Sequence, residues 1–326
     1  MPSIKRPAPL KMTVATLPPT QFLSMLDFGP DTLAACLRRA SELKAARAAG
    51  RRHEQPLAGL HVALLFEKPS LRTRSTFQIA VRELGGDTIE PPEDAALGGR
   101  ESIADVARNL ERWVAAAVVR TFAQARLEAF AAAAPQLRVV NALTDEEHPC
   151  QALADCLTLT EHLGDLRGRT VAFVGDGNNV AASLAQAVVM LGGTIRIASP
   201  EGFELAPAIA TGVSDRASRN GGELVLTSNP ADAVRGADAI YTDVWTSMGQ
   251  EDEATARRRI FSPYQVNAAL MAQAAARAVF MHCLPAHRGD EVTDEVIDSK
   301  ASVVFDQAEN RLHTQKALLA MLVSKH

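Results

Sequence analysis

Long hydrophobic runs are missing from this sequence of 326 residues. No apolar stretch approaches the ~20 residues that a membrane-spanning helix needs, and the first twenty residues lack the apolar core of a secretory signal peptide. They carry Lys5, Arg6 and Lys11 among several prolines, which is typical of a mobile arm. We therefore expect no membrane partner.

Cysteine is also scarce, and the four present, Cys36, Cys150, Cys156 and Cys283, form no C-x-x-C pair. This pattern indicates no disulfide framework, and free thiols are the usual state in the cytosol. We therefore expect a cytoplasmic protein. Cys36 and Cys156 lie in apolar patterns that predict core positions, whereas the other two lie inside motifs.

Neither an excess of positive charge nor many aromatic residues are found. The formal net charge is −4 and the pI is near 6.1, which disfavours a nucleic-acid partner. Aromatic residues make up only 5% while alanine is abundant, which favours many helices. Because a chain of this length exceeds one ordinary core, we expect about two domains.

What is present is an alternation of short apolar runs, which predict strands, and amphipathic segments, which predict helices. Such alternation is typical of an α/β fold, here two doubly wound parallel-sheet domains with an interdomain cleft. The expected strands are 61–66, 115–119, 137–141, 170–174, 194–198, 223–226, 238–242, 278–281 and 302–305. The expected helices include 75–84, 101–113, 148–163, 180–191, 230–235, 262–275 and 311–324.

The segment 66–74 reads Phe-Glu-Lys-Pro-Ser-Leu-Arg-Thr-Arg and places two hydroxyls and two guanidiniums between a strand and a helix. A helix N-terminus offers free backbone N–H groups and the positive end of the helix dipole. Arg72 adds a planar fork suited to a phosphate or carboxylate. The segment therefore predicts an anion site, and a surface arginine cluster that opens a helix is the alternative.

Two further segments carry groups suited to the same ligand. Arg120 ends an expected strand, where open α/β sheets place functional groups. His148 and Gln151 lie one turn apart at the start of the long helix, where an imidazole can donate to a carbonyl oxygen. A strand-end arginine and a capping histidine are the plainer interpretations, and a nucleophilic Cys150–His148 pair lacks an orienting partner.

The segment 175–180, Gly-Asp-Gly-Asn-Asn-Val, resembles half of a dinucleotide fingerprint. It lacks the third glycine, and the next expected strand does not end in an acidic residue. An NAD-dependent dehydrogenase is therefore an alternative rather than the first interpretation. Asn178 and Asn179 instead offer amides that suit the carboxylate of an amino acid.

Asp243 follows the expected strand 238–242, where it suits an ammonium group or caps the next helix. Ser247 and Met248 come after it, in a loop that Gly249 makes mobile. The position of these side chains at a strand end places them in the expected cleft.

The segment 282–288, His-Cys-Leu-Pro-Ala-His-Arg, also follows a strand. A metal held by His282, Cys283 and His287 is disfavoured because adjacent ring and thiol groups rarely ligate one ion and a fourth ligand is missing. We therefore expect no metal and place Cys283 in contact with the reacting groups. Arg311, after the last expected strand, is placed to return to the anion.

Taken in order, these motifs resemble those of the aspartate/ornithine carbamoyltransferase superfamily, and within it the ornithine carbamoyltransferases. The resemblance runs from about Phe22 to the C-terminus and rests on seven segments: 70–74, 118–122, 148–151, 175–179, 243–249, 282–285 and 309–311. The Ser-Met-Gly loop and the His-Cys-Leu-Pro segment separate the ornithine enzymes from the aspartate enzymes.

The resemblance implies transfer of the carbamoyl group from carbamoyl phosphate to the side-chain amine of L-ornithine, giving L-citrulline and phosphate for arginine biosynthesis. It implies no cofactor, and a homotrimer or a multiple of one with sites at subunit boundaries. Residues 1–155, joined by the C-terminal helix 308–326, would bind carbamoyl phosphate, and residues 156–307 would bind ornithine.

The resemblance also implies the site residues, with Cys283, Arg120 and His148 as the catalytic ones. Carbamoyl phosphate would be held by Ser70, Leu71, Arg72, Thr73, Arg120, His148, Gln151, Cys283, Leu284 and Arg311. Ornithine would be held by Asn179, Asp243, Ser247 and Met248.

Two positions depart from the family pattern. Many members have Ser-Thr-Arg-Thr where this chain has Leu71, and many contribute a Gln or His from a neighbouring subunit where this chain has Ala96. The alternatives within the family are a carbamoyltransferase for another amine, such as putrescine or an acylated ornithine, and a catalytically silent member that serves as a binding partner.

Overall fold

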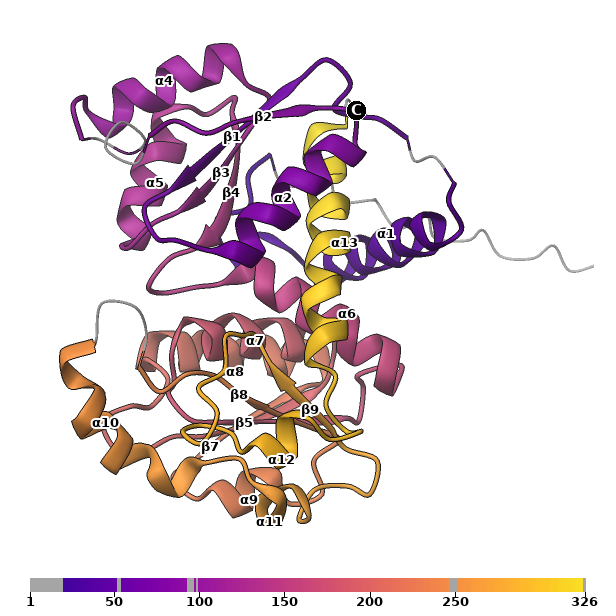
Figure 1. Cartoon of the computed structure of the whole chain (residues 1–326), viewed down its shortest axis with the longest axis vertical. Coiled ribbons are helices and arrows are strands. Elements are labelled where there is room, and N and C mark those ends of the chain that lie inside the picture. The colour runs from indigo at the N-terminus through magenta and orange to yellow at the C-terminus, as the bar shows by residue number, and fades with distance from the viewer. Residues whose placement is uncertain (1–19, 52–53, 93–96, 98, 247–250, 325–326) are drawn as a thin grey trace, which may run out of the picture.

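The protein is described from a computed structural model, which covers residues 20–51, 54–92, 97, 99–246 and 251–324. It has two α/β domains, one above the other, each built on a parallel sheet (Figure 1). This confirms the predicted fold class. The predicted N-terminal arm lies outside the described residues.

The first sheet has the strand order β2-β1-β3-β4, all parallel. The strands β1, β3 and β4 are almost wholly buried because helices cover both faces, which is why they read as continuous apolar runs, whereas the edge strand β2 is not buried. The strands are β1 (His61–Phe66), β2 (Asp87–Ile89), β3 (Ala116–Arg120) and β4 (Arg138–Leu143). Around them lie η1 (Met25–Asp27), α1 (Pro30–Ala48), α2 (Leu71–Glu83), α4 (Ile103–Trp113) and α5 (Gln124–Ala133).

Alternate side chains of these strands pack into two separate hydrophobic cores. Val62 and Leu64 of β1 join the core that includes α1 and α2, whereas Ala63 and Leu65 face the core that includes α4 and α5. The sheet is therefore held between two apolar layers, and its exposed residues lie at the start of β1 and in the edge strand β2.

The second sheet has the order β7-β6-β5-β8-β9, again all parallel. Its strands are β5 (Thr170–Val174), β6 (Thr194–Ala198), β7 (Glu223–Thr227), β8 (Ala239–Thr242) and β9 (Val279–His282). The helices α7 (Asn179–Met190) and α8 (Pro207–Asn220) share one core with the sheet, and α9 (Pro230–Val234), α11 (Ala268–Met271) and α12 (Asp294–Ile297) share the other. The remaining elements are η2 (Glu251–Glu253), α10 (Ala254–Phe261) and η3 (Ser262–Tyr264).

Two long helices join the domains. The chain passes down through α6 (Pro149–Leu163) and returns upward through α13 (Val304–Val323), which packs on α1, α2 and α6 (Figure 1). Among the described helices, none is both long and apolar enough to cross a bilayer.

The predicted strand 302–305 is wrong. Ser302 forms a single bridge with Phe280, and α13 begins at Val304. The run Ala-Ser-Val-Val-Phe has strong strand propensity, but the buried positions that follow repeat at helical spacing against α6. Tertiary packing therefore overrides the local preference.

The predicted helix 262–275 is also wrong as one element, because Gln265 is extended and Val266 bridges Val292 between η3 and α11. The helix expected at 75–84 begins four residues earlier, at Leu71. The C-terminal helix begins at Val304 rather than 308 or 311. The elements α5, α8, α10, α12 and β2 were not predicted. Their sequences are short or contain many exposed residues, so their hydrophobic periodicity is weak.

Candidate active site

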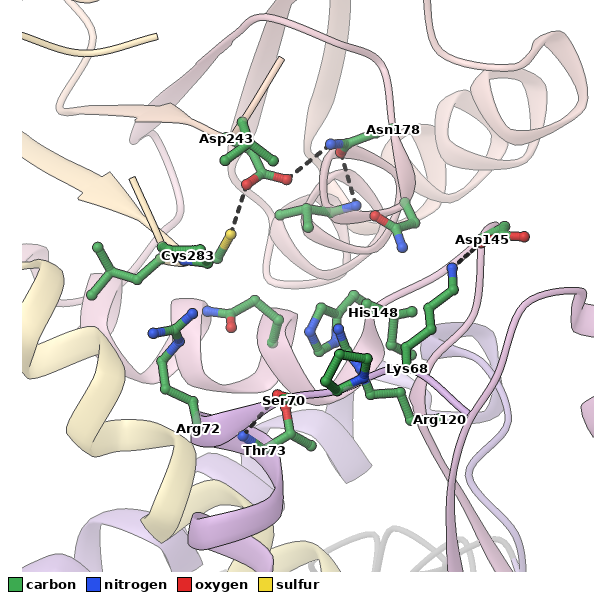
Figure 2. A pocket seen from close by; sticks show the side chains of 18 of the residues that line it. Lys68, Ser70, Arg72, Thr73, Arg120, Asp145, His148, Asn178, Asp243 and Cys283 are labelled. Carbon is green, nitrogen blue, oxygen red and sulfur yellow. Dashed lines mark hydrogen bonds and ion pairs between the residues drawn. The ribbon is translucent and has the colours of Figure 1, made fainter. Parts of the chain in front are cut away.

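A cleft of about 770 Å³ lies between the two sheets, where the carboxyl ends of their strands face each other (Figure 2). All the predicted site residues within the described part of the chain line it. The first domain contributes Ser70, Leu71, Arg72, Thr73, Arg120, His148 and Gln151. The second domain contributes Asn179, Asp243, Cys283 and Leu284, and α13 contributes Arg311.

The predicted anion loop is the start of α2. Ser70 is the N-cap, and its hydroxyl accepts from the Thr73 N–H at 3.2 Å. Leu71 and Arg72 are therefore the first two helical residues, whose N–H groups have no partner within a helix. The Leu71 side chain is 79% exposed, so the family departure at this position leaves the backbone geometry of the loop intact.

Three guanidiniums gather in the cleft, from Arg72, Arg120 and Arg311. Burial, together with repulsion from Arg311 and Arg72, lowers the pKa of Arg120 to about 10. Burial lowers the pKa of Arg72 and Arg311 as well. Within the described residues no carboxylate forms a salt bridge with any of the three. The cluster is therefore a positive site that an anion would stabilise.

Arg311 is almost fully buried although it lies on the last helix. Its Nη2 donates to Thr73 Oγ1 at 2.7 Å, and its Nη1 donates to Gln151 Oε1 at 2.5 Å. These two bonds tie α13 to the anion loop and to α6, and they set the position of the guanidinium.

His148 occupies the N-cap position of α6, and its backbone N–H donates to Ser183 Oγ at 2.9 Å. Burial lowers the pKa of His148 well below its usual value, and repulsion from Arg311, Arg120 and Arg72 acts in the same direction. The imidazole is therefore neutral at pH 7. It can give a hydrogen bond to a ligand oxygen without adding another positive charge.

Asp243 lies across the cleft from the guanidiniums, just after β8 (Figure 2). Its Oδ2 accepts from Asn178 Nδ2 at 2.9 Å, and its Oδ1 accepts from the Cys283 thiol at 2.9 Å. The alternative in which Asp243 caps the next helix does not fit these contacts. Burial raises the pKa of Cys283 well above its usual value, and Asp243 adds to the rise. Cys283 is therefore a thiol, not a thiolate.

The segment 175–180 does not present a dinucleotide site. The Asn178 side chain caps α7 by accepting from the Val180 and Ala181 N–H groups, so these two N–H groups are unavailable to a pyrophosphate. Asn179 Nδ2 donates to the Thr144 carbonyl at 2.6 Å. This hydrogen bond links the second domain to the first. This arrangement disfavours the dehydrogenase alternative.

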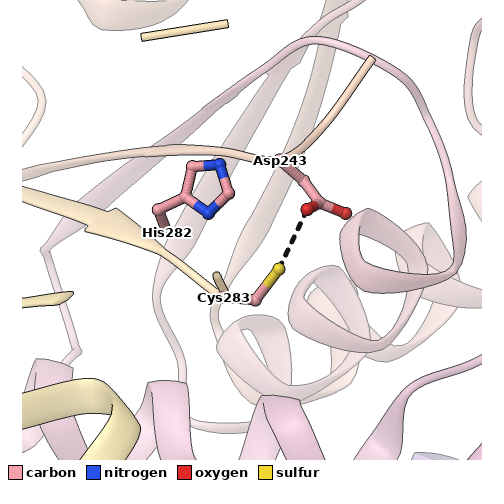
Figure 3. A group of neighbouring side chains, drawn as sticks. All are labelled: Asp243, His282 and Cys283. Carbon is pink, nitrogen blue, oxygen red and sulfur yellow. Dashed lines mark hydrogen bonds between the residues drawn. The ribbon is translucent and has the colours of Figure 1, made fainter. Parts of the chain in front are cut away.

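Asp243, His282 and Cys283 offer three ligand atoms within 4.8 Å of one another (Figure 3). His282 Nδ1 accepts from the Leu284 N–H at 2.9 Å, so its Nε2 carries the proton and donates to Glu291 at 3.1 Å. Both ring nitrogens are thus engaged, and the thiol is protonated. The donor set does not suit a metal.

Some lining residues were not predicted to have a role. Lys68 Nζ forms an ion pair with Asp145 Oδ1 at 2.5 Å and lies over the Phe122 ring. Lys68 stands in the anion segment, which was a usable signal, whereas nothing in the sequence around Asp145 indicates the cleft. The predicted residues Ser247 and Met248, and the departure at Ala96, lie outside the described residues.

Comparison with known proteins identifies the family. The family model described as "Aspartate/ornithine carbamoyltransferase, carbamoyl-P binding domain" matches residues 20–161, and the model described as the "Asp/Orn binding domain" of the same enzymes matches residues 167–322. The chain belongs to the aspartate/ornithine carbamoyltransferase family. This confirms the resemblance that the sequence motifs predicted.

Individual family members are similar over nearly the whole chain. The anabolic ornithine carbamoyltransferase of Pseudomonas aeruginosa is 47% identical over 93% of this chain and 96% of its own length. The ornithine carbamoyltransferase of Acidothermus cellulolyticus is 49% identical over 93% of this chain and 96% of its own length. The solved structure of the Pyrococcus furiosus ornithine carbamoyltransferase superposes with a TM-score of 0.89 at 46% identity, covering 92% of this chain and 96% of that one.

Proposed function

We propose that the chain catalyses transfer of the carbamoyl group from carbamoyl phosphate to the side-chain amine of L-ornithine, giving L-citrulline and phosphate. Family membership supports this activity, since the curated relatives are ornithine carbamoyltransferases. The observation that carries it is the charge separation in the cleft. Three guanidiniums without a carboxylate partner among the described residues face an aspartate and a thiol on the opposite wall.

On the first wall, we assign the phosphate to the start of α2. The N–H groups of Leu71 and Arg72, the hydroxyls of Ser70 and Thr73 and the Arg72 guanidinium suit a dianion at a helix N-terminus. We assign Arg120 and His148 to the carbonyl oxygen, where donors fixed in advance stabilise the charge of a tetrahedral intermediate. Arg311 completes the phosphate site.

On the opposite wall, we assign the α-ammonium of ornithine to Asp243 and its carboxylate to Asn179. On the resemblance to the family we also propose Ser247 and Met248 as ornithine-binding residues. Fixing the α-amino group at Asp243 directs the other amine toward the carbamoyl carbon. That amine resembles a lysine, with a pKa near ~10.4, so removing its proton at pH 7 costs roughly 4–5 kcal/mol. The positive wall helps to offset this cost because it disfavours a second ammonium.

Cys283 and Leu284 line the cleft from the second domain, and the Cys283 thiol donates to Asp243. Because Cys283 is a thiol, we assign it contact with the attacking amine rather than nucleophilic attack. The leaving phosphate is the acceptor for the proton of the amine. His148 is neutral and acts as a hydrogen-bond donor, not as a general acid that starts protonated.

We propose that residues 1–155, joined by the C-terminal segment 308–326, bind carbamoyl phosphate and that residues 156–307 bind ornithine. The packing of α13 on α1, α2 and α6 supports this division. We also propose a homotrimer in the cytoplasm, on the resemblance to the family. Sedimentation of the purified protein measures the number of chains directly.

The activity is tested by measuring citrulline formation from carbamoyl phosphate with ornithine, aspartate, putrescine and acetylornithine in parallel. Turnover with ornithine alone is the expected result. Preference for putrescine or acetylornithine would instead identify a carbamoyltransferase for another amine. A catalytically silent member would turn over none of the four amines.

Arg72→Ala tests the anion site. We expect carbamoyl-phosphate affinity to fall at least ~100-fold, since the variant removes a charge-assisted bidentate partner from a buried site. Arg82→Ala is the matched control, because Arg82 is exposed in the last turn of the same helix. Calorimetric titration measures both, and equal affinity in the two variants would remove Arg72 from the site.

A further inference from the structure

Asp155 is a buried carboxylate that the proposed chemistry leaves without a role. It lies in α6, one turn beyond Gln151, and has no exposed surface. Three hydrogen-bond donors surround it. Gln151 Nε2 and Gln307 Nε2 both donate to its Oδ1 at 2.7 Å, and the Tyr241 hydroxyl donates to its Oδ2 at 3.2 Å.

These contacts determine which way the Gln151 amide points. Both glutamine amides donate to the same atom, Asp155 Oδ1. An unprotonated carboxyl oxygen accepts hydrogen bonds but donates none, so Gln151 must turn its NH2 group toward Asp155. Its Oε1 then faces the cleft, where it accepts from Arg311 Nη1. A guanidinium can only donate, so the contacts at both ends of the amide require the same orientation.

The same carboxylate orients a second amide. Gln307 turns its NH2 group toward Asp155, and its Oε1 accepts from the His282 N–H at 3.0 Å. His282 directly precedes Cys283, so this bond holds the start of the segment that carries the thiol. One buried carboxylate therefore fixes two amides, that of Gln151, which lines the cleft, and that of Gln307, which holds His282.

An oxygen acceptor beside the phosphate site discriminates between ligands. Carbamoyl phosphate carries an NH2 group that can donate to Gln151 Oε1, whereas inorganic phosphate has none. A reversed amide would present its own NH2 group to the ligand NH2 and to Arg311, leaving donors facing donors. Unpaired or opposed donors in a buried site weaken binding far more than a lost surface contact does.

We propose that Asp155 is a positioning residue that holds the Gln151 amide with its oxygen toward the cleft and thereby selects a phosphate ligand that carries an N–H donor. This inference rests on the proposed function, because carbamoyl phosphate is the ligand so selected. Asp155 itself does not line the cleft and acts through Gln151.

The test measures the dissociation constants of two ligands for the wild-type protein and for Asp155→Asn, by calorimetric titration at pH 8. Phosphonoacetamide carries both the phosphonate and the carboxamide NH2, whereas inorganic phosphate carries only the anion. The asparagine side chain can donate to Gln151 Oε1 and so allows the amide to reverse. We expect the dissociation constant for phosphonoacetamide to rise about tenfold or more, with that for inorganic phosphate changed less than about twofold.

Asp238→Asn is the matched control. Asp238 lies just before β8, at the opposite end of that strand from the cleft, where it pairs with Arg169 at 3.0 Å. We expect this variant to bind both ligands as the wild type does. Equal weakening of both ligands by Asp155→Asn would indicate a general structural role and overturn the positioning role, and no weakening of either would overturn it as well.

Gln151→Met keeps the test decisive if Asp155→Asn folds poorly. If Asp155 acts through the Gln151 amide, Gln151→Met loses the preference for phosphonoacetamide. Adding Asp155→Asn to this variant then changes the preference less than about twofold, because both substitutions remove the same interaction. A Gln151→Met variant that keeps the preference overturns the proposal. A wild type that binds neither ligand overturns the proposed function together with it, whereas unselective loss in Asp155→Asn overturns the positioning role alone.

Discussion

Individual side chains in the cleft owe their chemical state to burial. Burial disfavours the charged form of both side chains, so His148 is neutral and Cys283 stays a thiol. The neighbouring guanidiniums act in the same direction on His148, as does Asp243 on Cys283. Arg120 keeps its charge even though burial lowers its pKa to about 10. The sequence alone would have allowed a reactive thiolate at Cys283, and only the surrounding atoms exclude it.

The thiol state of Cys283 predicts slow alkylation. The side chain is partly exposed to the cleft, yet the thiolate is the reactive form and its pKa is raised well above the ordinary value. We expect iodoacetamide at pH 8 to modify native Cys283 more than about tenfold more slowly than a free cysteine. Mass spectrometry of the intact protein measures the rate, and denatured protein is the control. Rapid modification of the native protein would indicate a thiolate.

In the second domain, the turn that joins β5 to α7 requires glycine at position 177. A Cβ atom on Gly177 would lie 2.3 Å from the Leu205 nitrogen and 2.5 Å from the Glu204 carbonyl carbon. Both neighbours are backbone atoms, so they cannot move aside as a flexible side chain would. The close approach places Asn178 and Asn179 at the start of α7, facing the cleft.

Gly177→Ala should therefore destabilise the protein by about 1–3 kcal/mol and raise the KM for ornithine, because the turn must move away from segment 203–205. Gly212→Ala is the matched control. Gly212 lies within α8 with no atom within 4 Å of the added Cβ, so alanine should stabilise the helix by about 0.5–1 kcal/mol. Urea unfolding measures both, and a neutral Gly177→Ala would contradict the steric argument.

At the scale of the whole molecule, Asp155 lies where the two domains meet. Its partners come from α6, from Tyr241 of β8 and from Gln307 of α13. Burial raises its pKa from 3.8 to about 7, and the hydrogen bonds and Arg311 act in the opposite direction. The folded protein therefore binds a proton at Asp155 that the unfolded chain releases between about pH 4 and pH 7.

This difference predicts how stability depends on pH. A raised carboxyl pKa stabilises the folded state below the unfolded pKa, and the benefit is lost as pH rises to about 7. The shift corresponds to at most about 4 kcal/mol. Glu147 and Asp176 have raised pKa values too, so the comparison with Asp155→Asn isolates one group. We expect the variant to gain stability relative to wild type from pH 4 to pH 7 in urea unfolding. If the free energies of unfolding of the two proteins changed with pH in the same way, the raised pKa of Asp155 would be contradicted.

The amino-acid sequence by itself determined the fold class and most of the cleft. Apolar runs predicted eight of the nine strands that form the two sheets, and parallel strands bring their carboxyl ends to one edge. Segments at those ends, such as 70–74 and 282–285, could therefore be assigned to one site although they are far apart along the chain. The strand β2 and the helices α5, α8, α10 and α12 were not predicted, because these elements are short or their hydrophobic periodicity is weak.

Only the tertiary structure decided which distant groups touch and in which chemical state they are. Arg311 reaches Thr73 across 238 positions of sequence, and Asp155 meets Gln307 and Tyr241 through packing that no local pattern encodes. Val304 and Phe305, which were predicted in a strand, begin α13 because burial against α6 outweighs strand propensity. Desolvation and long-range contacts depend on the neighbours of a residue in space, which is why the sequence indicated the site and the fold determined its chemistry.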